Sequence, residues 1–165
     1  MTIKSPGTPN VADLGGISST EKGSANGVAT LDSTGHIPPG QFTFASDNRA
    51  AQAANIGATT IYAIPAGRGG LYRVSAYCVV TQAATTSSTL PNLGILWSDD
   101  DSNTPLLASN VTPTNAANAI GAFGNGDIVI SARESTNIQF QTSNYASVGG
   151  TPMQYATHIR LEYLG

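Results

Sequence analysis

The chain has 165 residues, of which 40% are hydrophobic and only 10% are charged, and its formal net charge is −3. This size is sufficient for one modest core, so a second independent domain is not expected. Since the sequence contains no basic cluster and no cationic amphipathic helix, neither nucleic acid nor a membrane surface is an expected partner. The many Gly, Ser, Thr and Asn residues favour a β-rich fold with frequent turns.

The first 45 residues contain four prolines and isolated aliphatic side chains, without a sustained helical or strand period. Ordering the backbone costs roughly 1–2 kcal/mol per residue, which scattered aliphatic side chains cannot offset. The segment therefore cannot form a core by itself, so it is either disordered or laid against something else. We expect residues 1–45 to be an extended N-terminal arm that lies against a partner.

The stretch "SDNRAAQAANIG" (46–57) has the composition of a short helix. Ser46 or Asp47 can cap its N-terminus, its four alanines favour helix, and Gly57 stands where a C-terminal glycine is common. A plain linker is the alternative. Residues 46–58 are accordingly predicted to be a short helix or linker.

From residue 59 onward, side chains alternate with the period of β-strands. The clearest early case is 71–83, where Tyr72, Val74, Ala76, Cys78 and Val80 share one face, and Arg73, Ser75 and Thr81 share the other. The predicted strands are 59–65, 71–83, 93–98, 127–132, 136–143 and 153–164. Polar loops are expected at 84–92, 99–118 and 143–151. Residues 59–165 are therefore predicted to be an all-β, antiparallel β-sandwich of the jelly-roll type.

The last predicted strand is the most strongly patterned. One face carries Tyr155, Ile159, Leu161 and Tyr163, and the other carries Gln154, His158, Arg160 and Glu162. Such a strand suits the interior of a sheet. Because one such unit is small, packing three copies around an axis would bury additional side chains. The sequence therefore predicts a homotrimer in which these four apolar residues belong to the core or to the subunit contact.

Catalytic chemistry is weakly represented. A Ser/His/Asp arrangement could be built from His158 with Asp127 or Glu134, but no "GxSxG" motif supports it, and the other histidine, His36, lies in the arm. The glycine-rich "GAFGNGD" (121–127) has no Lys and leads into a strand, so it is interpreted as a turn rather than a phosphate loop. We expect no enzymatic activity and no cofactor.

Two further features have both a ligand-binding and a structural interpretation. "SDDDSN" (98–103) could offer oxygen ligands to a cation such as Ca²⁺, but consecutive carboxylates point in different directions, so a solvated turn without metal is expected. Trp97 and the tyrosines could stack on sugars, but most share strand faces with aliphatic residues, so core filling is expected. Cys78 is predicted to be a small buried hydrophobic residue.

The stretch "ANGVATLDSTGHIPPGQ" (25–41) alternates, turns at Asp32–Gly35 and stops at Pro38–Pro39, which predicts a short β-arch that needs neighbours. Within it, "KGSANGVATLDSTGHIP" (22–38) resembles an element recurrent in virion proteins of tailed bacteriophages. The closing "SNYASVGGTPMQYATHIRLEYLG" (143–165) is similar to the last strands of small trimeric jelly-roll modules of phages. Val28, Leu31, Ile37 and Pro38 are the arm residues expected to anchor the protein to a virion.

The resemblance implies a structural protein located in the virion. The first interpretation is a capsid decoration or cement trimer, whose partner is the major capsid protein. The alternative is a tail-fibre or baseplate receptor-binding tip that contacts a tail or baseplate protein and a host surface glycan. Because no long shaft separates the arm from the β-rich region, decoration is favoured. The N-terminal "MTIKSPGTPN" lacks the apolar region of a signal peptide, which predicts assembly in the cytoplasm of the bacterial host.

Overall fold

The computed structural model of the chain describes residues 45–111 and 118–165, which belong to the compact unit Thr43–Gly165. The elements in these residues are ten β-strands. This part of the chain contains no helix that is long and apolar enough to cross a membrane. The strands are β1 (Ala45–Gln52), β2 (Thr59–Ala63), β3 (Gly70–Gln82), β4 (Ser87–Thr89), β5 (Asn92–Ser98), β6 (Pro105–Val111), β7 (Phe123–Ala132), β8 (Asn137–Ser143), β9 (Ala146–Val148) and β10 (Gln154–Tyr163).

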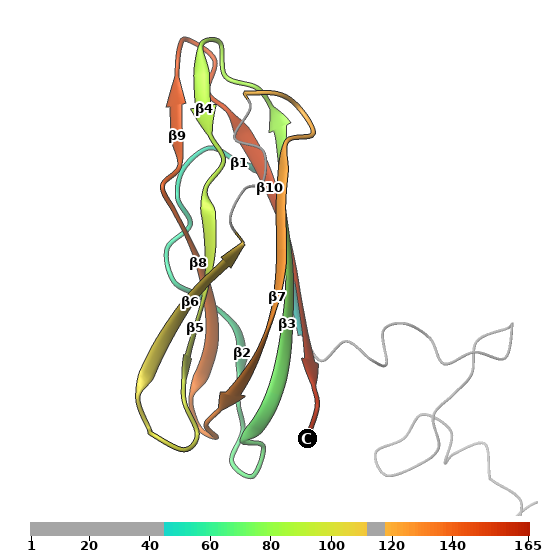
Figure 1. The fold of residues 1–165 in the computed structure, drawn as a ribbon, viewed down its shortest axis with the longest axis vertical. Coiled ribbons are helices and arrows are strands. Elements are labelled where there is room, and N and C mark those ends of the chain that lie inside the picture. Colours follow the sequence, from blue (N-terminus) through green and yellow to red (C-terminus); the bar gives the residue numbers. More distant parts are fainter. Residues whose placement is uncertain (1–44, 112–117) are drawn as a thin grey trace, which may run out of the picture. The chain divides into compact units, whose positions relative to one another are not determined.

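The strands form two four-stranded sheets that lie face to face, as Figure 1 shows. One sheet has the order β1-β10-β3-β7, and the other has the order β2-β8-β5-β6. The short pair β4-β9 forms a third sheet at one end of the two layers. Every pairing between strands is antiparallel. The predicted all-β antiparallel class is thus confirmed, and the last strand, β10, occupies the interior of its sheet.

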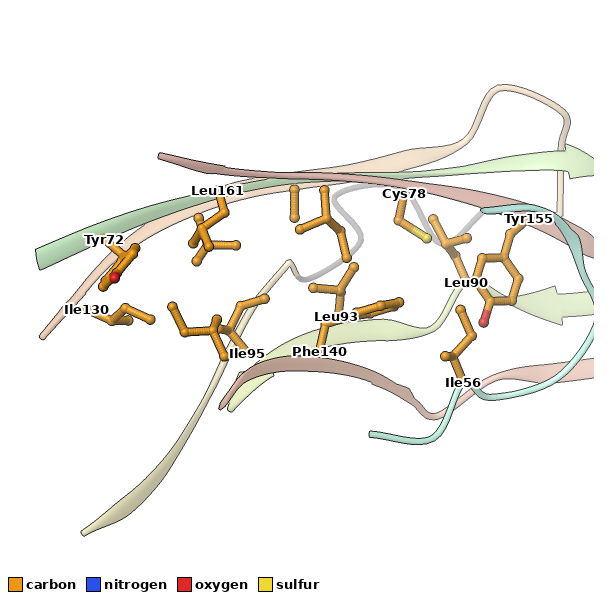
Figure 2. Packing of buried hydrophobic residues seen from close by; sticks show 14 of the residues in the cluster. Ile56, Tyr72, Cys78, Leu90, Leu93, Ile95, Ile130, Phe140, Tyr155 and Leu161 are labelled. Carbon is orange, nitrogen blue, oxygen red and sulfur yellow. The ribbon is translucent and has the colours of Figure 1, made fainter. Parts of the chain in front are cut away.

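The core lies between the two large sheets (Figure 2). Along β3, the apolar face predicted from the alternation is buried throughout, and Arg73, Ser75 and Thr81 are exposed. The facing sheet contributes Leu93 and Ile95 from β5 and Phe140 from β8. Full burial of one such side chain stabilises a fold by about 1.5–3 kcal/mol. The strand period in the sequence therefore identified the side that forms the core.

The predicted helix at 46–58 is wrong, because Ala45–Gln52 form strand β1. β1 pairs with β10 from Ala45↔Leu161 onward, and a register shift between Arg49 and Gln52 ends the regular ladder. Alanine content favours helix only weakly, whereas pairing satisfies the backbone groups of a whole strand edge. Gly57 does not have a left-handed φ, whereas Ala51 does, at 53°. The β-rich unit consequently begins near residue 45 rather than at residue 59.

Several segments predicted to be loops or turns contain strands. The loop predicted at 84–92 contains β4, that at 143–151 contains β9, and that at 99–118 contains β6. Only the first part of "GAFGNGD" is a turn, with Gly121 at a φ of 86°, since β7 already begins at Phe123. Gly124 and Gly126 pair with Cys78 and Ala76 of β3. β4, β7 and β9 each pair with a strand that is distant in the sequence, whereas β6 pairs with the preceding strand β5. Pairing thus determined the structure of segments that lack strong strand propensity.

A buried polar network holds the connection between β1 and β2 against the core. The Tyr155 hydroxyl donates to the Ala54 carbonyl at 2.7 Å and lies 3.0 Å from the Thr142 hydroxyl. Because a tyrosine hydroxyl has one proton, Thr142 is the donor in the second bond. The Thr142 hydroxyl in turn accepts from the Ile56 amide at 2.7 Å. The chain therefore crosses from one sheet to the other with its buried polar atoms paired.

Candidate functional site

The predicted site residues fall into two groups. Val28, Leu31, Ile37 and Pro38, together with His36, lie outside the described residues. On β10, Tyr155, Ile159 and Leu161 are completely buried between the sheets. Tyr163 is half-buried and packs against Tyr72, with 5.0 Å between the ring centroids. Because the inner face of β10 is occupied by the core, a subunit contact on this strand requires its opposite face.

His158 lies on that opposite face, away from the acidic residues considered with it in the sequence. Its Nδ1 lies 3.0 Å from Asn48 Oδ1, an acceptor, so this ring nitrogen is the donor. Asp127 is on β7, separated from β10 by strand β3. The Glu134 carboxylate accepts a hydrogen bond from the Gly67 amide. The structure therefore places His158 in a polar pair on a sheet surface and does not bring it together with either carboxylate.

The acidic run 98–103 forms a turn between β5 and β6. Asp99 Oδ1 accepts hydrogen bonds from the Ser102 amide at 2.9 Å and from the Ser102 hydroxyl at 2.8 Å. These bonds favour the charged carboxylate, the backbone bond most strongly, and hold the pKa of Asp99 below its usual value. Among the described residues, no three His, Cys, Asp or Glu side chains are grouped so that they could hold a metal ion. The Asp99 carboxylate thus stabilises the turn by accepting these two hydrogen bonds.

Cys78 is on the inner face of β3 and is completely buried. Burial disfavours the thiolate and raises the pKa of its thiol to about 12. A thiol with this pKa is a poor nucleophile at neutral pH. The predicted role as a small buried hydrophobic residue is confirmed.

An exposed aromatic cluster lies on the outer face of the β1-β10-β3-β7 sheet, which is the side turned away from the second sheet. The Tyr77 ring stacks on Phe123 at a centroid distance of 5.7 Å and lies 6.3 Å from the His158 ring. Tyr77 and Phe123 are 38% and 41% exposed, although solvated faces of antiparallel sheets are usually polar. We call Tyr77, Phe123 and His158 the aromatic cluster. The sequence analysis did not identify it as a site.

The signal for this cluster was present in the alternation of β3. Tyr77 has the phase of Arg73 and Ser75 and is therefore out of phase with the five apolar residues of the buried face. Phe123 could not be recognised in the same way, because the glycines that follow it were interpreted as a turn and the strand was predicted to begin only at residue 127. Of the six tyrosines, Tyr77 is the one on the outer face. Tyr72 and Tyr155 are fully buried, and Tyr62, Tyr145 and Tyr163 pack against the core.

Charged side chains occupy the middle of the same outer face. Arg73 on β3 pairs with Glu162 on β10, with 3.4 Å between Nη1 and Oε2. Arg160 on β10 and Asp127 on β7 flank Ser75 of β3 in register. Two cationic and two anionic residues thus lie beside the aromatic cluster. The outer face combines apolar contact area with charges of both signs.

A second feature is a groove of about 330 Å³ beside the other sheet, lined in part by Leu96, Trp97, Asn137 and Gln139. Trp97 packs partly against the core, as the core-filling interpretation predicts. Its indole Nε1 is buried and has no hydrogen-bond partner in the described part of the chain. The groove therefore offers amide groups and the apolar surface of Leu96 rather than an exposed indole donor.

Comparisons with known proteins give similarities of structure but none of sequence family. No protein-family model matches the chain, and no curated protein matches it. Among solved structures, the chain is similar to a chain of the "Cyanophage Pam1 capsid asymmetric unit". The sequence identity is 15%, the TM-score is 0.33, and the match covers 85% of this chain and 98% of that chain.

Proposed function

We propose that this chain is a non-enzymatic structural protein of a tailed-phage virion, a homotrimer that decorates the head and is anchored by its N-terminal arm. The observation that carries this proposal is the order of two segments. The stretch 22–38, which resembles a recurrent virion-protein element, is followed almost directly by a β-sandwich that begins at Ala45. A binding arm followed by a rigid β-domain suits a protein that attaches to a larger particle.

The jelly-roll part of the proposal is supported by the strand order. Apart from the short β4 and β9, eight strands form two sheets with the orders β1-β10-β3-β7 and β2-β8-β5-β6. Double-sheet jelly rolls have eight strands, in which sequence neighbours are frequently found in opposite sheets. Here β1 and β2, β2 and β3, and β7 and β8 each lie in opposite sheets.

Attachment would depend on the arm. Val28, Leu31, Ile37 and Pro38 are the arm residues assigned to contacts with the major capsid protein, through apolar burial and backbone hydrogen bonds. Each arm incurs an entropic cost when it becomes ordered, so a single arm would bind weakly. Three arms on one trimer raise the effective concentration of the second and third contacts, which increases the overall affinity.

The test is co-sedimentation of the full-length protein with undecorated capsids of the parent phage. The variant Val28→Ser/Leu31→Ser/Ile37→Ser should lose saturable binding. The matched control Val11→Ser/Leu14→Ser/Ile17→Ser removes three aliphatic side chains from the arm outside the 22–38 stretch and should retain most of the binding. Full occupancy by the first variant would show that the stretch is not the anchor.

The alternative function is a receptor-binding tip of a tail fibre or baseplate that recognises host surface glycans. The groove beside Leu96 favours it, because the amides of Asn137 and Gln139 are groups that bind sugar hydroxyls. In this case the protein would bind host cells, and free surface polysaccharide would compete. Asn137→Ala/Gln139→Ala would weaken that binding without affecting capsid binding. Saturable capsid binding without cell binding would exclude this alternative.

A further inference from the structure

The outer face of the β1-β10-β3-β7 sheet exposes more apolar surface than a solvated sheet requires. Leu71, Tyr77, Phe123 and Val129 all point outward there, each with more than a third of its surface exposed. They are four of the nine large hydrophobic residues that are exposed in the described part of the chain. Apolar residues gathered on one face characterise interaction surfaces.

The register of the sheet arranges this face in rows across the strands. One row contains Asn48, His158, Tyr77 and Asn125. The next row contains Ser46, Arg160, Ser75 and Asp127. In this second row the positive side chain lies toward the β1 edge and the negative side chain toward the β7 edge. The row is therefore positively charged near one edge of the sheet and negatively charged near the other.

Because the two charges are opposite, the face of one copy can be electrostatically complementary to the same face of a second copy. Rotation about an axis parallel to the strands leaves the height of every row unchanged, so each row of one copy meets the same row of the next. In such an arrangement the β7 side of one copy meets the β10 side of its neighbour. Arg160 then lies opposite Asp127, and the aromatic cluster of one copy meets that of the next. Apolar contact and charge pairing thus favour the same arrangement.

We infer that this outer face is the contact between copies of the chain, around an axis parallel to the strands, with Arg160 of one copy facing Asp127 of the next. The inference rests on the proposed function for the number of copies, three. It assigns the aromatic cluster to the centre of the contact and Arg160 and Asp127 to its selectivity. Like charges would meet if the two copies were shifted so that Arg160 faced Arg73.

Disulfide cross-linking tests this geometry directly. Within one chain, positions 160 and 127 lie on strands separated by β3, hence about 9.5 Å apart. This exceeds the Cα separation that a disulfide can bridge. Any disulfide in Arg160→Cys/Asp127→Cys must therefore join two molecules. Mild oxidation should link the full-length protein into covalent trimers on a non-reducing gel, and each single variant should give at most dimers. The native Cys78 is buried and does not take part.

A matched control uses the other sheet. Thr60 and Leu96 occupy one row there and flank Gln139 of β8 in the same way. Thr60→Cys/Leu96→Cys should give only background cross-linking. If the outer-face pair also gives only this background while native mass spectrometry shows a trimer, the inference is overturned and the proposed function stands. A wild-type chain that stays monomeric at micromolar concentration overturns both the inference and the proposed trimer.

The apolar part of the contact is tested by dilution. Tyr77→Ser/Phe123→Ser should weaken each subunit contact at least about tenfold, hence the association constant of a three-contact ring about a thousandfold. Leu107→Ser is the matched control, because Leu107 is 54% exposed on the other sheet. Sedimentation velocity over a dilution series measures the effect, and near-UV circular dichroism verifies the fold. Unchanged association of the folded Tyr77→Ser/Phe123→Ser variant would overturn the inference.

Discussion

The two faces of the β1-β10-β3-β7 sheet use the same residue type in different ways. On the inner face, the hydroxyls of Tyr72 and Tyr155 donate to the backbone carbonyls of Arg68 and Ala54. On the outer face, Tyr77 stacks on Phe123 while more than a third of its surface is exposed. A buried tyrosine whose hydroxyl is bonded within its own fold is a structural element. An exposed tyrosine that stacks on a second aromatic ring presents area to another molecule.

The strongest way to test this contrast is to remove one phenylalanine from each region. Phe140 is completely buried opposite the inner face, and Phe140→Ala should lower the free energy of unfolding by about 3–5 kcal/mol. Phe123→Ala on the outer face should cost less than about 1 kcal/mol, and its effect should depend on protein concentration, because association stabilises the folded state. Urea unfolding at two protein concentrations measures both. Equal losses for the two variants would contradict the division into core and contact faces.

A smaller effect is expected from removing one hydroxyl group. Tyr155→Phe leaves the Ala54 carbonyl without its donor and the Thr142 hydroxyl without its acceptor in a buried site, which should cost about 1–3 kcal/mol. Tyr77→Phe should change stability by no more than about 0.5 kcal/mol. Thermal unfolding of both variants at one concentration provides the comparison. A Tyr155→Phe protein as stable as the wild type would show that the network does not hold the crossover.

The two faces should also differ in thiol chemistry and its dependence on pH. The folded-state pKa of Cys78 is raised by burial to about 12, so the unfolded chain loses this proton first as the pH rises. The free energy of unfolding therefore keeps its full value below about pH 9, as far as Cys78 is concerned, and falls between about pH 9 and 12. At pH 10 the loss should be about 1 kcal/mol. It should be absent in Cys78→Ala.

A thiol reagent provides the matched comparison at pH 8. Cys78 should remain unlabelled in the folded protein at any concentration. Ser75→Cys, on the outer face of the same strand, should react within minutes when dilution separates the copies and more slowly when they are associated. Rapid labelling of wild-type protein under native conditions would mean that the inner face opens far more often than a core should.

The smallest effect is expected for the exposed ion pair. In a single copy of the chain Arg73 and Glu162 are both partly solvated, so in dilute, dissociated protein Arg73→Gln or Glu162→Gln should cost less than about 1 kcal/mol at low salt and less at high salt. A double-mutant cycle at two ionic strengths measures the coupling. Coupling that persists at high salt would indicate that the pair is shielded from solvent, as it would be inside a subunit contact.

The inner face could be predicted from the sequence, whereas much of the sheet around it could not. Regular alternation in 71–83 and 153–164 identified β3 and β10, because burial on one side leaves a period of two. β1 was missed because its alanines carry helix propensity, and its partner strand lies about a hundred residues further along the chain. β6 was missed for a different reason, since its seven residues stand within a polar region, although its partner β5 directly precedes it in the chain.

The candidate site was predictable only in part. Tyr77 shares a face of β3 with the polar residues Arg73 and Ser75, so one member of the aromatic cluster could have been found from the sequence. Phe123 and His158 come near it only through pairing of β3 with β7 and β10. The same holds for Arg160 and Asp127, which flank Ser75 from strands distant in the sequence. Register therefore determines which surface residues become neighbours, and a single sequence does not contain that register.

The interior position of β10 has a consequence for synthesis on the ribosome. Both β1 and β3 form ladders with this strand, so the sheet remains incomplete until residue 163 has left the exit tunnel. Pairings between segments so distant along the chain are intrinsically slow to form. Until then, the edges of β1 and β3 are open to strands of other nascent chains, which favours aggregation. Slowing translation should therefore do little for folding yield, whereas lowering the expression rate, which spaces out incomplete chains, should increase it.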